Sequence, residues 1–286
     1  MLLPIPGVSV CVPVHNGERF LAEAIRSVLD QTYRDFELVI LDNASRDGTS
    51  DIVRSFQGDP RMRVEHYAQL LPEMEARNRA VQLSRAPLVK VVLADDMLHP
   101  RCLELEAGAM ETDPGLALAA GRQHLLDDQT RVVVPRRGLS GLIGVRTGVE
   151  VARRIVRHGG NPIESPGGVL FRREDFFNAG GWRSDRGSVA DLDLWMRLLQ
   201  YGEFVGLDET LGGFRLQSGT AATMGRKATA AEQREYVREL TEYSTFAVRG
   251  LDTLIGRLGS PVARLRSTLL GFASRRARRR TDSAAA

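Results

Sequence analysis

The segment "VSVCVPVHNGERFLAEAIRSVLDQTYRDFELVILDN", residues 8–43, determines the fold class. Both of its ends, residues 8–14 and 36–42, are rich in β-branched and other apolar residues and are typical of strands. Between them, four apolar residues recur at the spacing of one helix face: Leu21, Ile25, Val28 and Leu29. A strand, a helix and a second strand of these lengths predict a βαβ unit with parallel strands.

The same alternation of strand and helix patterns continues to about residue 100. The expected elements are a helix over 47–56, a strand over 62–67, a helix over 73–84 and a strand over 88–94. Beyond them we expect a helix over 100–112, strands near the sheet edge over 115–128 and 131–135, and a loop over 136–147. Last come a short strand within 165–174, an amphipathic helix over 191–202 that ends at a glycine, and helix from about residue 229. The whole pattern predicts an α/β fold with a mostly parallel sheet.

Composition restricts the class of protein. The chain has 286 residues, of which 43% are hydrophobic and 26% charged, with a net charge of +3, as in ordinary soluble globular proteins. Two cysteines, Cys11 and Cys102, are too few for a disulfide framework, so a reducing cytoplasm is expected. The start "MLLPIPG" does not resemble a signal peptide, and no window is long and apolar enough to span a bilayer.

Polar clusters follow the predicted strands at their carboxyl ends, where open α/β sheets bind ligands. They are "PVHNGE" at 13–18, "LDNASRDGT" at 41–49, "ADD" at 94–96 and a later "ADLD" at 190–193. Each one alone could be a solvated loop, but four such clusters favour a binding site. Neither GxGxxG after the first strand nor GxxxxGK[ST] occurs, so the common dinucleotide and P-loop sites lack their signature.

The ordered set of motifs resembles the family 2 glycosyltransferases, which have the GT-A fold. The matching pieces are Pro13 and Asn16, "SVLDQTY" (27–33), "ELVILDNASRDGT" (37–49), "EARN" (75–78), "LADDMLHP" (93–100), "NPIESPGGVLFRREDFFNAGGW" (161–182) and "ADLDLWMRL" (190–198). The resemblance covers residues 7–220 and implies a Rossmann-like, mostly parallel sheet flanked by helices. It implies a glycosyltransferase domain over 1–225, with a nucleotide-sugar half (1–100) and an acceptor half (101–225), and a helical C-terminal extension over 226–286.

The resemblance implies a divalent cation, Mg²⁺ or Mn²⁺, at the pair of carboxylates after the fourth strand. Hard oxygen ligands suit these ions, and the growing charge on a diphosphate leaving group needs one. By analogy with the family, Asp96 reaches the metal, and Asp95 contacts the ribose or a water on the metal. Many members carry a further Asp where this chain has Ala94. The alternative is that the acidic pair only caps the next helix.

Donor-binding residues also follow from the resemblance. Asp42 matches the family residue that hydrogen-bonds the base, usually uracil, and a carboxylate can accept its N3–H. The backbone around Pro13, Val14 and His15, together with Asn16, is expected to line the same pocket. Asn43, Ser45 and Asp47 are expected to shape the turn and cap the helix. Arg77, in "EARN", matches a position near the diphosphate; the alternative is a solvated arginine on a helix surface.

The general base implied by the resemblance is Asp191, at the start of the helix "ADLDLWMRL". In inverting transfer such a base takes the proton of the acceptor hydroxyl as the oxygen displaces the nucleotide. Ala190 stands where the family usually has Glu. Asp193, two positions on, points elsewhere on a helix. The alternative role of Asp191 is stabilisation of the helix N-terminus.

Two segments depart from the family pattern. "FRLQSGT" (214–220) has Gln217 where many members have a histidine near the metal or diphosphate. The region after the third strand, "HYAQLLPEMEARN" (66–78), replaces the usual Asn- and Gly-rich loop. Metal affinity and donor specificity are therefore left open by the sequence.

The sequence thus predicts an inverting, metal-dependent glycosyltransferase that moves a sugar from a UDP- or dTDP-sugar to an acceptor hydroxyl. The acceptor class (saccharide, lipid-linked or small molecule), the donor sugar and the oligomeric state remain open. A sugar-nucleotide pyrophosphorylase and a catalytically silent scaffold or nucleic-acid binder are the alternatives; the first lacks its Gly-rich loop, and the terminal arginines make nucleic acid an unexpected partner. The segment "SRRARRR" (274–280) and the residues before it fit either a peripheral contact with an anionic membrane or a helix packed on the catalytic domain. Cytoplasmic localisation is expected in both cases.

Overall fold

The computed structural model describes most of the chain. The described residues are 5–163, 165–215, 221–242, 246, 248 and 252, with side chains for all of these except 221–230. Gln217, the residues beyond 252 and their basic segment lie outside the described part of the chain.

The first βαβ unit forms as the sequence predicts. Strands β1 (Val8–Val14) and β2 (Phe36–Asn43) are parallel neighbours, in register from Val8 opposite Phe36 to Val14 opposite Asp42. Helix α1 (Leu21–Leu29) joins them and buries Leu21, Ala24, Ile25 and Val28. The apolar spacing of α1 therefore faces the sheet, as expected for a crossover helix.

The next elements extend this sheet with parallel strands on both sides of the pair. They are α2 (Thr49–Phe56), β3 (Met62–Tyr67), α3 (Glu73–Gln82) and β4 (Leu88–Val91). Strand β4 ends three residues earlier than the predicted 88–94. The Val92 N–H still donates to the Cys11 carbonyl, and the chain then turns, with the Asp96 N–H donating to the Leu93 carbonyl over 3.0 Å. The acidic pair therefore lies in a turn just beyond the strand.

The remaining strands complete a ten-stranded sheet within the described residues, in the order β3-β2-β1-β4-β9-β6-β10-β5, with β7 on β6 and β8 on β10. Their bounds are β5 (Met97–Leu98), β6 (Leu116–Leu126), β7 (Val132–Arg137), β8 (Gly144–Arg146), β9 (Val169–Arg172) and β10 (Glu203–Arg215). The prediction that residues 115–128 lie near the sheet edge is wrong, because β6 lies between β9 and β10. The predicted loop over 136–147 contains the end of β7 and all of β8.

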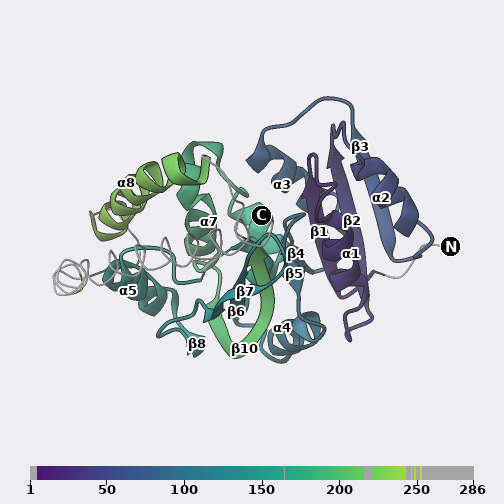
Figure 1. Cartoon of the computed structure of the whole chain (residues 1–286). Coiled ribbons are helices and arrows are strands. Elements are labelled where there is room, and N and C mark those ends of the chain that lie inside the picture. Colours follow the sequence, from purple (N-terminus) through teal and green to yellow (C-terminus); the bar gives the residue numbers. More distant parts are fainter. Residues whose placement is uncertain are drawn as a thin grey trace.

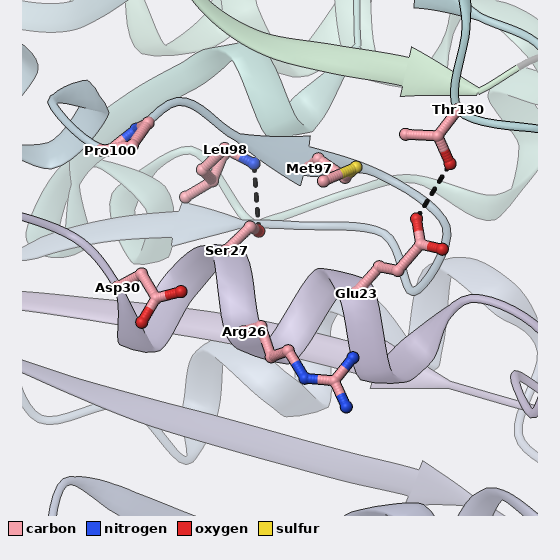
Figure 2. A pocket seen from close by; sticks show the side chains of 8 residues that line it. All are labelled: Glu23, Arg26, Ser27, Asp30, Met97, Leu98, Pro100 and Thr130. Carbon is pink, nitrogen blue, oxygen red and sulfur yellow. Dashed lines mark hydrogen bonds between the residues drawn. The ribbon is translucent and has the colours of Figure 1, made fainter.

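Strand β5 also brings α1 next to the segment that follows the acidic pair. The Leu98 N–H donates to Ser27 Oγ over 3.1 Å, and a hollow of about 480 Å³ opens between α1 and β5 (Figure 2). The wall of this hollow is completed by Thr130, from the turn between β6 and β7.

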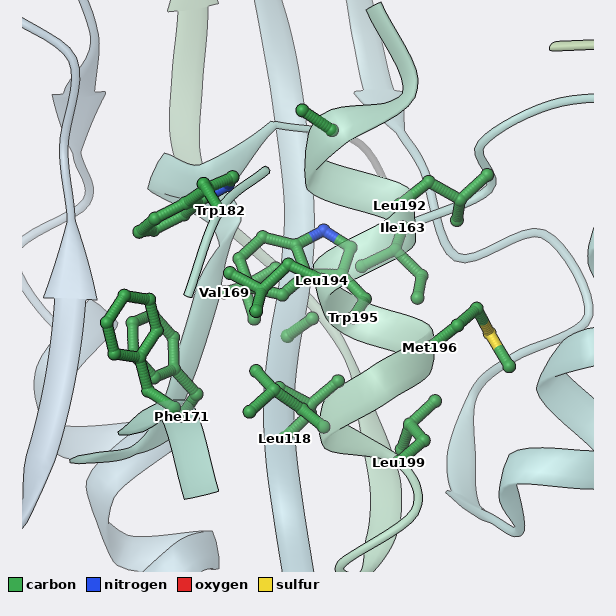
Figure 3. Close-up of a cluster of buried hydrophobic side chains, with 14 of the residues drawn as sticks. Leu118, Ile163, Val169, Phe171, Trp182, Leu192, Leu194, Trp195, Met196 and Leu199 are labelled. Atoms are coloured by element: carbon green, nitrogen blue, oxygen red, sulfur yellow. The ribbon is translucent and has the colours of Figure 1, made fainter. Parts of the chain in front are cut away.

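Two hydrophobic layers sandwich the sheet. One layer packs α1, α2 and α4 (Cys102–Thr112) on one face. The other packs α3, α5 (Gly148–His158), α6 (Arg173–Asn178) and α7 (Ala190–Leu198) on the opposite face (Figure 1). At the centre of the second layer, Trp182 and Trp195 pack edge to face, with ring centroids 6.1 Å apart, against β9 and β6 (Figure 3).

Helix α7 and the C-terminal helix differ from the sequence prediction. Helix α7 ends at Leu198 rather than at Gly202, and it is buried on nearly all sides rather than amphipathic. A short 3₁₀ segment, η2 (Ser184–Val189), leads into it, as η1 (Pro166–Gly168) leads into β9. Helix α8 (Ala221–Glu242) begins eight residues before the expected residue 229. Within the described part of the chain, no helix has the length and apolar character needed to cross a membrane.

Candidate functional site

The candidate site lies at one edge of the sheet. Strands β1, β2, β3, β4, β6 and β10 run in the same direction, so their carboxyl ends share this edge. Strand β9 is antiparallel to β4 and β6, which brings its amino end, and Gly167 just before it, to the same edge. The topology therefore gathers the clusters that follow β1, β2 and β4, as predicted, and adds the ends of β6 and β10. The fourth predicted cluster, 190–193, does not follow a strand, because it begins α7.

Asp42, at the end of β2, is a buried carboxylate held by three neighbours. Its Oδ1 accepts the Ser45 N–H over 3.1 Å, and its Oδ2 accepts the Ser50 hydroxyl over 2.9 Å and lies 3.3 Å from His66 Nδ1. Burial alone would raise the pKa of Asp42, but these hydrogen bonds outweigh it and lower the pKa below its usual value. Asp42 is therefore an ionised acceptor at neutral pH.

The turn after β1 is fixed by hydrogen bonds to the turn after β2. His15 Nδ1 lies 2.8 Å from the Asn43 carbonyl, which can only accept, so Nδ1 carries the proton and Nε2 accepts from Asn16 Nδ2 at 3.1 Å. The Asn16 N–H donates to Ser45 Oγ, and Asn16 adopts a left-handed φ of 52°. The two loops therefore form one rigid wall.

Two further side chains of this wall shape the turns, as the sequence predicts, but the predicted helix cap is wrong, because α2 has Gly48 as its N-cap and no side-chain cap hydrogen bond. Asn43 exchanges two hydrogen bonds with the Leu71 backbone, and the Asp47 carboxylate accepts the backbone N–H groups of Glu18 and Thr49. They shape the turns around the site.

A hollow of about 300 Å³ opens between this wall and the turn after β4. Its lining residues are His15, Asn16, Gly17, Arg19, Phe20, Ala94, Asp95 and Asp128. His15, Asn16 and Asp95 are thus brought together as predicted. Pro13, Val14 and Asp42 do not line it; Val14 is buried in the core, and Asp42 is only 3% exposed.

Asp96 is the most unusual carboxylate at this edge. It is 1% exposed; its Oδ1 accepts the Arg215 N–H over 3.3 Å, and its buried Oδ2 has no hydrogen-bond partner among the described residues. Burial, followed by the charge of Asp95, raises the pKa of Asp96 well above its usual range. The alternative role of the pair, capping of α4, is excluded because α4 begins only at Cys102 after Arg101.

Asp191 and Arg77 form the opposite side of the site. Arg77 Nη1 and Trp182 Nε1 donate to the same oxygen, Asp191 Oδ1, over 2.9 and 2.8 Å. Burial raises the pKa of Asp191 even though both donors favour its charged form. Arg77 is only 6% exposed, so it is not the solvated surface arginine of the alternative interpretation. Its positive charge also lowers the pKa of Asp96, although burial and the charge of Asp95 outweigh this effect.

Asp193 points away from this group, as predicted. It pairs with Arg197 at 2.8 Å and with Arg186 at 3.5 Å. These partners hold it on another side of α7 from Asp191.

A model of the family described as "Glycosyl transferase family 2" matches residues 9–177. The chain belongs to this family. An uncharacterized protein of Mycobacterium tuberculosis is 31% identical over 202 residues, which are 68% of this chain and 62% of that protein.

Two solved structures share the fold. S. aureus TarS (residues 1–349), in complex with UDP-GlcNAc, has a TM-score of 0.61 at 18% identity over 76% of this chain and 60% of that one. The mannosyltransferase PcManGT from Pyrobaculum calidifontis, in complex with GDP-Man and Mn²⁺, has a TM-score of 0.61 at 17% identity over 94% of this chain and 81% of that one. The predicted GT-A type fold is thus confirmed. The chain spans less than two thirds of the length of the M. tuberculosis relative and of TarS.

The fit of this family member to a divalent cation depends on Asp96. Among the described residues, no three His, Cys, Asp or Glu side chains gather closely enough to hold an ion by themselves. Asp96 Oδ2, however, is a buried oxygen without a hydrogen-bond partner among the described residues, so it is available as a ligand for a cation. Ions such as Mg²⁺ commonly use one or two carboxylates and take their other ligands from substrate phosphates and water. The residues therefore fit an ion that arrives with a diphosphate.

Sequence reasoning missed two residues of the site, Trp182 and Arg215. Trp182 ends the motif at 161–182 but showed no sign of its bond to Asp191. Arg215 stands in "FRLQ" two positions before Gln217, and its signal was one arginine directly after the uncharged stretch "LGGF". Gln217 itself lies outside the described residues.

Proposed function

We propose that this family 2 member is an inverting glycosyltransferase that moves a sugar from a nucleotide-sugar donor to an acceptor hydroxyl. The observation that carries the proposal is a pair of carboxylates at this edge of the sheet, Asp96, which is buried, and Asp191, which is partly exposed and held by Arg77. Asp96 offers an unpartnered oxygen, and Asp191 is held through one oxygen by Arg77 and Trp182. A carboxylate that can hold a cation for the leaving diphosphate and a base for the acceptor hydroxyl are the two groups that metal-assisted inverting transfer uses.

The donor we propose is a UDP- or dTDP-sugar. The ionised Asp42 is the hydrogen-bond acceptor for the N3–H of the base, beside the wall formed by His15 and Asn16. TarS is described as bound to UDP-GlcNAc, which supports a uridine nucleotide; PcManGT is described as bound to GDP-Man, so the same fold accepts another base. We propose residues 1–100 as the donor half and 101–225 as the acceptor half.

The leaving nucleotide requires charge compensation. Asp96, with Asp95 beside it, would hold Mg²⁺ or Mn²⁺, which would neutralise negative charge on the departing diphosphate. Arg77 adds a fixed positive charge that is bonded to Asp191 and also acts on Asp96. We propose that Arg77 orients Asp191 and offsets charge on the diphosphate side.

The general base we propose is Asp191. Both donors contact Oδ1, which leaves Oδ2 as the oxygen that takes the proton of the acceptor hydroxyl. The raised pKa makes this carboxylate a stronger base than an exposed Asp. Its side chain is 23% exposed, so it is accessible from the site.

We place the reaction in the cytoplasm, with a saccharide, lipid-linked or small-molecule hydroxyl compound as acceptor. Two free, buried thiols, Cys11 and Cys102, fit a reducing compartment. Peripheral contact with an anionic membrane through residues 274–280 remains one of the two proposals for that segment, which lies outside the described residues.

A thermal-shift screen tests the proposal. UDP-, dTDP- and GDP-sugars are added with and without Mn²⁺, because a true donor stabilises the fold by mass action. We expect a metal-dependent shift with a UDP- or dTDP-sugar, and UDP release that is lost in Asp96→Ala. A shift with UTP plus sugar 1-phosphate and pyrophosphate release would favour the pyrophosphorylase alternative. No response to any nucleotide would favour the silent scaffold.

A further inference from the structure

Arg215, the last residue of β10, is a fully enclosed charge. It is 1% exposed, and its guanidinium lies over the Phe20 ring, 4.0 Å from the centroid. Arginine is almost never buried to this degree unless all of its donors are used.

All five N–H groups of the Arg215 side chain have partners. Nε donates to the Asp95 carbonyl over 3.0 Å; Nη1 donates to the Asp127 carbonyl and to Thr130 Oγ1, both over 3.0 Å. Nη2 donates to Glu23 Oε2 over 2.9 Å and lies 3.8 Å from Met97 Sδ. Every N–H donor of the Arg215 side chain is engaged, and the Phe20 ring covers one face of the guanidinium. The side chain therefore has no group left to bind a phosphate.

The partners of Arg215 come from separate parts of the chain. Asp95 belongs to the turn after β4, and Asp127 and Thr130 belong to the turn between β6 and β7. Thr130 Oγ1 in addition donates to Glu23 Oε2 over 3.0 Å, which ties this turn to α1 (Figure 2). Arg215 is thus the point at which the acidic turn, the β6–β7 turn and α1 are joined.

Asp96 has little else to hold it in place. Its side chain accepts a single hydrogen bond among the described residues, from the Arg215 backbone N–H. The position of this carboxylate therefore depends on the backbone of its own turn. Arg215 Nε holds that backbone by donating a hydrogen bond to the Asp95 carbonyl.

We propose that Arg215 is a positioning residue that clamps the Asp95–Asp96 turn to the β6–β7 turn and thereby fixes the Asp96 carboxylate for a divalent cation. The part of the proposal that concerns the cation rests on the proposed function. The clamp itself does not, because it follows from the contacts alone.

The clamp is tested by amide hydrogen exchange of the full chain without ligand. In Arg215→Met we expect faster exchange in residues 93–98 and 126–131, because the side-chain bonds are lost while the Arg215 backbone N–H remains. Thr130→Val is a milder variant that keeps the β-branched shape at a residue with φ of 61° and removes only the hydroxyl between Arg215 and Glu23. Thr130→Val should show a smaller increase in exchange over the same residues. It still tests the clamp if Arg215→Met does not fold.

The cation is tested by calorimetric titration of Mn²⁺ in the presence of UDP. Loss of a residue that orients a metal ligand costs roughly 10- to 100-fold in metal affinity, which we expect for Arg215→Met. For Thr130→Val we expect about a fivefold loss, the value of one ordinary hydrogen bond.

Arg172→Met is the matched control. Arg172 also donates to three backbone carbonyls, those of Met110, Asp113 and Leu116, but it is paired with Leu88, at the opposite end of β4 from the acidic turn. Because Arg172 has only a structural role, Arg172→Met should lower the melting temperature. It should leave Mn²⁺ affinity and the hydrogen exchange of residues 93–98 unchanged.

Each outcome decides the matter. Unchanged exchange at 93–98 in both Arg215→Met and Thr130→Val would overturn the clamp. Faster exchange with unaltered Mn²⁺ affinity would overturn the positioning role. The variants could show faster exchange at 93–98 while the wild-type protein binds no nucleotide. That result would support the clamp and would contradict only the proposed function.

Discussion

Arg77 Nη1 donates to Asp191 Oδ1 over 2.9 Å, although 114 residues separate the two in the chain. The bond joins α3, which covers the strands of the first βαβ units, to α7, which packs under β6 and β9. Arg77 is buried and its Nε has no partner among the described residues. A buried, incompletely satisfied arginine that ties two helices across the sheet edge makes the position of Asp191 dependent on both parts of the fold.

Asp191→Asn should keep donor binding and lose transfer. The amide preserves size and can still accept from Arg77 and Trp182 through its oxygen, but it cannot take a proton. General-base catalysis contributes about 10²- to 10⁴-fold, so kcat should fall by that factor while the thermal shift with UDP and Mn²⁺ persists. Asp193→Asn is the comparison, since Asp193 pairs with Arg197 and Arg186; it should lower stability and spare kcat. The assignment of the base would be wrong if the two variants exchanged these effects.

Trp182→Phe should move the acid limb of the kcat profile to higher pH. Burial raises the pKa of Asp191, and the indole N–H bond opposes this by favouring the carboxylate. Removing that bond raises the pKa further, so a higher pH is needed to ionise the base. The measurement is kcat between about pH 5 and 9 with saturating donor and acceptor.

Trp195→Phe is the control for this effect. Trp195 packs against Trp182 in the same aromatic cluster, but its buried Nε1 has no hydrogen-bond partner among the described residues. The substitution therefore disturbs packing without touching Asp191, and the pH profile should stay in place. If the acid limb of the kcat profile moved equally in Trp182→Phe and Trp195→Phe, packing rather than the hydrogen bond to Asp191 would set its position.

Much of the fold could be predicted because its signals are local. The elements up to β4 are each specified by periodicity within about ten residues, and short crossovers leave few topologies. The place of β6 could not be predicted in this way. Its run "LALAA" at 116–120 shows no alternation, and its partners β9 and β10 lie far along the chain.

In the candidate site, too, the residues marked by local motifs could be predicted, and the contacts between distant segments could not. Asp42, Asp96 and Asp191 could be named from motifs because each stands at the end of one element. The clamp by Arg215 could not, because its acceptors belong to three separate segments and two of them are backbone carbonyls, which carry no residue identity. The bond from Trp182 to Asp191 depends in the same way on how the loop after α6 packs against the start of α7.

Asp96→Asn should stabilise the fold at neutral pH and abolish metal-dependent nucleotide binding. The pKa of Asp96 is raised in the folded state, so the folded protein holds this proton more tightly than the unfolded chain does. The stability linked to this group is complete below the unfolded pKa of about 3.9 and is lost as the pH rises through the folded pKa. An amide avoids that loss, which for an unpartnered buried group is about 1–3 kcal/mol.

Thermal unfolding at two pH values checks this prediction. At about 2–4 °C per kcal/mol, Asp96→Asn should melt several degrees above the wild type at pH 7.5 and close to it near pH 4. Saturating Mn²⁺ and UDP should raise the melting temperature of the wild type only. A variant that melts below the wild type at pH 7.5 would contradict the proposed cost of this carboxylate.

Gly167→Ala should weaken metal binding through Asp96 alone. A Cβ at Gly167 would lie 3.1 Å from Asp96 Oδ2, and Gly167 is not among the glycines with positive φ, so alanine fits its backbone. The added methyl group presses on the oxygen that we propose as the cation ligand. We expect about a tenfold loss of Mn²⁺ affinity in the presence of UDP.

Gly108→Ala separates this effect from the general consequences of adding a methyl group. Gly108 lies inside α4, and a Cβ there would have no atom within 4 Å. It should stabilise the protein by about 0.5–1 kcal/mol through helix propensity and leave the Mn²⁺ titration unchanged. If Gly167→Ala bound Mn²⁺ and UDP as tightly as Gly108→Ala does, then Asp96 Oδ2 would not be the oxygen that meets the cation.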